Sequence, residues 1–226
     1  MKITYLGHSA LQIDIDTTQL VVDPFITGNP LAKDQISLRQ LAPNYVLITH
    51  AHQDHILDAE TLAKQSGAVI VSNFEIVHYY KAKGLEGLAM NYGGTLRFPF
   101  GWLKYVNAVH SSSFPDGTYG GQPGGFLLRA NGKTIYIAGD TALHTDMKLI
   151  PEYGAVDLAV LPIGDNFTMG AEDAVRAAGF VQCNRVLGVH YDTFPPIRID
   201  REKAVSCFVK AGKKLLLPNI GETLTV

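Results

Sequence analysis

Six consecutive residues, His-Ala-His-Gln-Asp-His at positions 50–55, constrain the fold of this chain more than any other segment. They follow the apolar run Tyr-Val-Leu-Ile-Thr, which is typical of a buried strand. Imidazole nitrogens and carboxylate oxygens bind zinc, and they also suit manganese and iron. If the chain stays extended, His50 and His52 project to one side, whereas Asp54 and His55 leave the next turn in other directions. The spacing predicts two ligands for each of two neighbouring metal ions at a strand end.

Three further residues with metal-binding side chains lie immediately after predicted strands: His110, Asp140 and His190. Side chains from several strand ends can converge on one edge of a sheet, where functional residues are common. His110 would join the two ligands of the first ion, and His190 those of the second. Asp140 could bridge both ions with its two oxygens. Each residue alone could equally be an ordinary polar residue at a strand end, whereas the whole set favours a two-ion site.

Apolar patterning divides the rest of the chain into strands and helices. Strand patterns occur around residues 3–5, 11–15, 20–22, 45–49, 68–71, 102–109, 125–129, 134–138, 156–163, 185–189, 215–217 and 223–226. Helical patterns occur at 59–66, 73–83, 168–181 and 201–211, with Asp58, Thr168 and Asp200 as N-caps. The loop 111–125 is long enough to form a wall of a binding site, or to be an ordinary surface loop. Two strand-rich layers flanked by helices predict an α/β protein, a four-layer αββα sandwich in one domain over residues 1–226.

Composition narrows the range of partners and cellular locations. The 226 residues are 46% hydrophobic and 18% charged, which is typical of a compact protein. The net charge is −2 and the lysines and arginines are scattered, so we expect no nucleic-acid partner. No apolar run approaches the ~20 residues of a membrane span, and the first residues are too polar for a signal peptide. We expect a cytoplasmic protein without a membrane partner, and the sequence leaves a homo-oligomer open.

The two cysteines give no sign of a disulfide. Cys183 and Cys207 lack C-x-x-C spacing and fall within predicted helical regions. Reduced, buried thiols are common at such positions, so we expect both cysteines to be free.

The motif order H-x-H-x-D-H, then His, Asp and His, resembles that of the metallo-β-lactamase superfamily over nearly the whole chain. Gly139-Asp140-Thr141 is similar to the bridging-aspartate motif of that superfamily. Leu6-Gly7-His8-Ser9 and Asp23-Pro24 resemble segments of its small cytosolic metal-dependent hydrolases, the group related to ascorbate-6-phosphate lactonase. The resemblance implies the αββα fold and a histidine near the metal centre at position 8. From the residues alone, a surface turn is an equal alternative for His8.

The ligand set predicts hydrolysis of a small-molecule substrate. We expect two divalent ions, of which zinc is the first choice and manganese or iron the alternatives. They could hold a bridging hydroxide, because metal binding lowers the pKa of water from ~15.7 to ~7. This hydroxide would attack a small ester, lactone or phosphoester, and the ions would stabilise the oxyanion. Asp54 could orient the nucleophile or carry its proton to the leaving group. Asp165, which follows a strand, could face the cleft or cap a helix, and Tyr191 could donate to an oxyanion or simply pack.

Three other functions use the same ligands. A phosphodiesterase or nuclease would need a basic groove or stacking platform, for which the sequence gives no sign. A di-iron oxidoreductase would favour a ligand set richer in carboxylates than this one. A non-catalytic metal-binding scaffold would keep all the ligands without turnover.

Overall fold

Two seven-stranded mixed sheets pack face to face in the computed structural model, which describes residues 1–226. The first sheet has the order β14-β1-β2-β3-β4-β5-β6. Its strands are β1 (Lys2–Gly7), β2 (Ala10–Ile15), β3 (Thr18–Val22), β4 (Tyr45–Leu47), β5 (Val69–Asn73), β6 (Gly87–Met90) and β14 (Thr223–Thr225). In the centre of this sheet β3, β4 and β5 are parallel, and β1 runs in the same direction because it is antiparallel to β2.

The second sheet has the order β13-β12-β11-β10-β9-β8-β7. Its strands are β7 (Thr95–Phe98), β8 (Gly101–Asn107), β9 (Gly124–Ala130), β10 (Lys133–Ile137), β11 (Leu158–Pro162), β12 (Arg185–Val189) and β13 (Lys214–Leu216). β10 to β13 are parallel, and β8 shares their direction because β9 is antiparallel to both β8 and β10. The two halves of the chain therefore build sheets of similar design.

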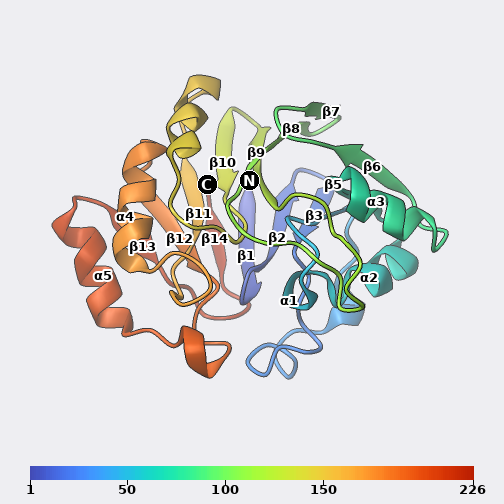
Figure 1. Ribbon diagram of the computed structural model, residues 1–226, viewed down its shortest axis with the longest axis horizontal. Helices are drawn as coiled ribbons and strands as arrows, with labels where there is room; N and C mark the ends of the chain where they lie inside the picture. The colour runs from blue at the N-terminus through green and yellow to red at the C-terminus, as the bar shows by residue number, and fades with distance from the viewer.

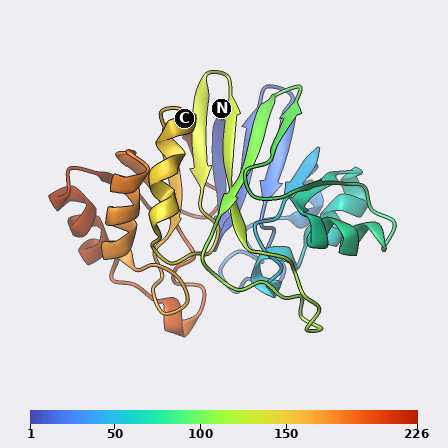
Figure 2. The same cartoon turned by 45° about the horizontal axis from the view of Figure 1, so that its top comes forward.

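Helices cover the outer faces of both sheets. They are α1 (Gln53–Ile56), α2 (Ala59–Ser66), α3 (Phe74–Lys81), α4 (Ala171–Phe180) and α5 (Arg201–Lys210), with 3-10 helices η1 (Leu38–Gln40), η2 (Thr145–Tyr153) and η3 (Pro195–Ile197). Figures 1 and 2 show α2 and α3 on one side of the paired sheets and α4 and α5 on the other. None of these helices combines the length and apolarity needed to cross a bilayer.

Three apolar clusters hold these layers together. A cluster of 22 buried residues lies between the sheets and includes Leu11 and Val22 from the first and Phe126 and Leu187 from the second. A cluster of 21 joins the second sheet to α4, α5 and η2, and one of 17 joins the first sheet to α2 and α3. Burial of apolar surface is the main force that stabilises such layers. The predicted αββα sandwich is confirmed.

Two of the three predicted helix caps need correction. α4 begins at Ala171 with Gly170 as its N-cap, so the prediction of Thr168 was wrong. Asp58 does occupy the N-cap position of α2, but its carboxylate binds the loop after β3, accepting from Thr27 N at 2.9 Å. Asp200 caps α5 as predicted, accepting from the backbone N–H of Lys203 at 3.0 Å.

Both cysteines are free, as expected. Cys207 lies on α5, but Cys183 follows the end of α4, so its predicted place within a helix was wrong. The chain breaks helical geometry at Gln182, whose φ of 52° is left-handed.

Candidate metal centre

Three histidines form one compact group at the end of the sandwich. His50 follows β4, His52 is the N-cap of α1, and His110 follows β8. One ring nitrogen of each lies within 4.8 Å of those of the other two, with Nε2 of His50 3.0 Å from Nδ1 of His52. Ser111 Oγ lies 3.4 Å from the other ring nitrogen of His52, so the long loop after β8 borders this group. The sequence predicted these three residues as ligands of one ion.

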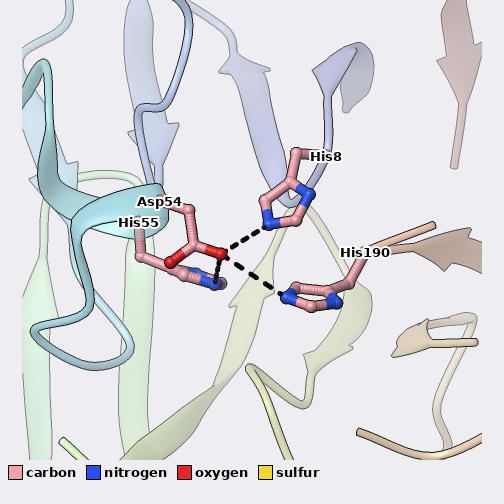
Figure 3. A group of neighbouring side chains, drawn as sticks. All are labelled: His8, Asp54, His55 and His190. Carbon is pink, nitrogen blue, oxygen red and sulfur yellow. Dashed lines mark hydrogen bonds and ion pairs between the residues drawn. The ribbon is translucent and has the colours of Figure 1, made fainter. Parts of the chain in front are cut away.

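A second group surrounds Asp54, the first-turn acidic residue of α1 (Figure 3). Its Oδ2 lies 3.0 Å from Nε2 of His8, 3.7 Å from Nε2 of His190 and 4.0 Å from Nε2 of His55. His8 and His190 come from the turns after β1 and β12. The structure thus brings together the three residues predicted for the second ion and adds His8 to them. The ring of His8 is buried, so the alternative that His8 lies in a surface turn is wrong.

Asp140 lies between the two groups. Its Oδ2 is 2.9 Å from His190 Nε2 and 3.3 Å from His55 Nε2 on one side. On the other side it is 3.7 Å from His110 Nε2 and 3.9 Å from His50 Nε2. One carboxylate oxygen therefore reaches histidines of both groups, which is the arrangement that a bridging ligand requires.

The buried polar atoms of this centre fit a metal. Nε2 of His55 and Oδ1 of Asp140 are buried without any hydrogen bond in the protein. Native proteins rarely leave such atoms without a partner, because the cost of desolvation is then uncompensated. The seven predicted ligands and His8 converge here, and imidazole and carboxylate donors both suit zinc, manganese and iron. Metal coordination would satisfy atoms that the protein itself leaves unpaired.

Asp23 supports both groups from the turn after β3. Its Oδ2 accepts from His55 Nδ1 at 3.0 Å and from the Thr49 hydroxyl at 2.7 Å. The same hydroxyl lies 3.0 Å from Nδ1 of His50. Because Nδ1 of each histidine is engaged, the neutral ring of each would carry its lone pair on Nε2, the nitrogen that faces the centre. The sequence argument used Asp23 only as part of a resemblance; its position directly after a strand was the signal for this role.

Left-handed backbone at three of these residues directs their side chains. His8, Asp23 and His190 have φ values of 56°, 43° and 56°. Residues other than glycine adopt this conformation at a cost of order 1–3 kcal/mol, and functional sites are where such strain accumulates. The backbone N–H of His190 donates to the carbonyl of His8 at 2.9 Å, which ties the two turns together across the sheets.

Charge is finely balanced within the centre. Burial lowers the pKa of the His8 imidazole to about 4, so this ring is neutral at pH 7. Burial acts in the same direction on His190, but the carboxylates of Asp140 and Asp54 prevail and raise its pKa to about 9. Burial also opposes ionisation of Asp140, yet the neighbouring imidazoles hold its pKa well below the usual range. The negative charges of Asp54 and Asp140 favour a cation between them and the histidines, and a bound metal ion would displace the proton of His190.

The other two candidate residues lie outside the cluster. Asp165 is exposed on the loop after β11 and lines a separate groove of about 810 Å³ at the start of α4 and α5. Tyr191 is buried next to His190, and its ring stacks on Tyr5 with centroids 6.4 Å apart. Neither residue contacts a predicted ligand through its side chain.

Comparison with known proteins places the chain among hydrolases. A family model described as the beta-lactamase superfamily domain matches residues 2–190, which include all seven predicted ligands. A UPF0173 metal-dependent hydrolase of Christiangramia forsetii is 58% identical over 224 residues, 99% of each chain. A protein of the same family name from Thermus thermophilus is 52% identical over 202 residues, 89% of this chain and 88% of its own. The structure of Igni18, a metallo hydrolase from Ignicoccus hospitalis, matches with a TM-score of 0.90 at 36% identity, covering 99% of this chain and 97% of that one.

Proposed function

The chain belongs to the beta-lactamase superfamily and is a metal-dependent hydrolase, and from this we propose that its site holds two divalent ions and hydrolyses a small ester, lactone or phosphoester. His50, His52 and His110 would hold the first ion, and Asp54, His55 and His190 the second. Asp140 would bridge them. Zinc is the first choice for this imidazole-rich set, with manganese and iron as alternatives.

One observation carries the two-ion proposal: Oδ2 of Asp140 lies within 3.9 Å of Nε2 atoms from both histidine groups. A mononuclear site would need only one of these groups. The second group has supporting hydrogen bonds as well: Asp23 accepts from His55, and the Thr193 hydroxyl lies 2.9 Å from Nδ1 of His8, whose ring contacts Asp54. Such supporting contacts fix the ring orientation of metal-binding histidines.

The residues divide the remaining work. Divalent ions, when bound by these ligands, would supply a hydroxide nucleophile at neutral pH and would stabilise negative charge on the substrate oxygen. The Asp54 side chain is 28% exposed, against 4% for Asp140, so Asp54 is the carboxylate that a substrate can reach. Nε2 of His8 lies 3.0 Å from its Oδ2 and orients it. Asp54 is therefore suited to carry a proton to the leaving group.

Replacing His52 or Asp140 by Ala tests this assignment. We expect about two metal ions per wild-type chain by inductively coupled plasma mass spectrometry, and fewer in both variants. Hydrolysis across a panel of esters, lactones and phosphodiesters should fall by at least about 1,000-fold, because metal ions stabilise transition-state charge by several kcal/mol. His78→Ala is the matched control, since His78 is an exposed histidine on α3. Full metal content and activity in His52→Ala and Asp140→Ala would contradict the proposal, and a metal-loaded protein that is inert towards the whole panel would favour a scaffold.

A further inference from the structure

A second, smaller cavity of about 220 Å³ borders the metal centre but contains none of its seven predicted ligands. His8 and Tyr191 form part of its wall, Arg201 lies at the start of α5, and Ile220 comes from the loop between β13 and β14. Water occupies about 30 Å³ per molecule in the liquid, so the cavity has room for about seven waters or for a small organic molecule.

Arg201 brings unused hydrogen-bond donors to this cavity. Its Nε donates to Oδ2 of Asp192 at 2.9 Å, and this is its one hydrogen bond within the protein. The other oxygen of Asp192 accepts from the backbone N–H of Ile199 at 3.0 Å. Asp192 is therefore fully engaged in holding the guanidinium, whose two terminal nitrogens are left without partners. Planar, bidentate recognition of a carboxylate is what a guanidinium provides best.

The rest of the wall mixes polar and apolar side chains. The guanidinium carbon of Arg201 lies 5.3 Å from the ring centroid of Tyr191, which in turn stacks on Tyr5. Leu31, Pro218 and Ile220 add apolar surface, whereas Gln35, Asp192 and Asn219 are polar members of the wall. Donors without a protein partner, next to the apolar surface of Tyr191 and Ile220, match a molecule with one carboxylate and a small apolar body.

We propose that this cavity binds a small monocarboxylic acid, with its carboxylate on the terminal nitrogens of Arg201 and its apolar part against Tyr191 and Ile220. Binding of the acid does not require the metal ions. This site therefore goes beyond the proposed hydrolytic function and can be tested independently of it. His8 separates the two sites, because it lines the cavity while its Nε2 lies 3.0 Å from Asp54.

Calorimetric titration of the purified holoprotein with benzoate, and with benzamide as its neutral counterpart, tests the proposal. We expect benzoate to bind and benzamide to bind at least tenfold more weakly. Arg201→Gln should weaken benzoate binding at least tenfold, because charge-assisted hydrogen bonds are lost. Arg198→Gln is the matched control, since Arg198 is an exposed arginine of the same segment that lies outside this cavity.

Two further variants separate this cavity from the metal centre and from a folding defect. His52→Ala removes a predicted metal ligand and should leave benzoate binding unchanged. Ile220→Phe fills the cavity while keeping Arg201, and it should also weaken binding at least tenfold. Loss of binding in His52→Ala with retention in Arg201→Gln would overturn the proposal, because benzoate would then sit on the metal ions. Equal affinity for benzamide, or no benzoate binding by the wild type, would overturn it as well.

Discussion

The ligands of this centre are held by a few neighbouring side chains, of which Asp23 is the most connected. Its carboxylate accepts from His55 directly and reaches His50 through the hydroxyl of Thr49. One residue thus orients a histidine in each of the two groups. Such supporting carboxylates raise the basicity of the histidine and fix its tautomer, so their loss weakens metal binding without removing a ligand.

We therefore expect Asp23→Asn to weaken metal binding about 10- to 100-fold, the range found when supporting residues of metal ligands are changed. The measurement is a competition titration against a chromophoric chelator. Asp16→Asn is the control, because Asp16 also has a left-handed φ, 52°, but lies in an exposed turn. Equal metal affinity of Asp23→Asn and wild type would show that the hydrogen bonds of Asp23 do not act on the metal.

The buried His8 should make the stability of the metal-free protein depend on pH. Burial lowers its folded-state pKa from 6.5 to about 4. As the pH falls from 6.5 towards 4, the unfolded chain takes up this proton before the folded protein does, so the free energy of unfolding decreases. One such group contributes a slope of up to about 1.4 kcal/mol per pH unit.

Urea unfolding of chelator-treated protein between pH 7 and pH 5 measures this slope. His8→Asn removes the titrating ring, and asparagine tolerates the left-handed φ of 56° at this position. We expect a smaller loss of stability on acidification in the variant than in the wild type. Identical slopes would mean that His8 does not contribute.

At the scale of elements, strand direction assembles the site. β1, β3 and β4 of the first sheet run in one direction and end at His8, Asp23 and the segment before His50. In the second sheet β8, β10 and β12 share a direction and end near His110, Asp140 and His190. Carboxyl ends of parallel strands meet at the same edge, so residues far apart in the chain converge there.

The loop after β11 presses closely on the turn that carries His190. A Cβ atom at Gly164 would lie 2.0 Å from the His190 carbonyl oxygen, so Gly164→Ala must displace one of the two segments. We expect a loss of about 1–3 kcal/mol of stability, as for other overpacked sites, and weaker metal binding through displacement of His190.

Gly179→Ala on α4 is the matched control for this substitution. Its Cβ meets nothing within 4 Å, and alanine is favoured over glycine within a helix by roughly 0.5–1 kcal/mol. Urea midpoints should therefore move in opposite directions for the two variants. A neutral effect of Gly164→Ala would show that the close approach to His190 relaxes freely.

At the scale of the whole molecule, the two sheets depend on each other. The 22-residue cluster between them takes side chains from both, and β14 from the end of the chain pairs with β1 at its start. The backbone N–H of Val226 donates to the carbonyl of Met1 at 3.1 Å, and Figure 1 shows both termini near the middle of the molecule. We infer that residues 1–226 form one cooperative domain.

Differential scanning calorimetry tests this inference. We expect one unfolding transition whose calorimetric and van't Hoff enthalpies agree, because neither sheet can bury its inner face without the other. Two resolved transitions, each assignable to one half of the chain, would contradict it.

The layers of the fold and the candidate ligands could be predicted from the amino-acid pattern. Alternating apolar residues specify the strands, and His50, His110 and Asp140 stand out because each follows a strand that the pattern identifies. Both signals are local: they depend on residue type and on spacing of a few positions. The prediction of Thr168 as the N-cap of α4 was wrong because the exact start of a helix depends on its neighbours in space.

The side chains that support the ligands, and the distances between the ligands, follow from the tertiary structure alone. The close approach of Asp140 to both histidine groups, the hydrogen bonds of Asp23 and the contact of His8 with Asp54 join residues that are 32 to 90 positions apart in the chain. The cavity beside Arg201 likewise needs the loops after β3 and β13 to meet α5. Contacts between distant segments depend on the direction of the strands and on how the sheets pack. Residue type and short-range spacing do not specify them.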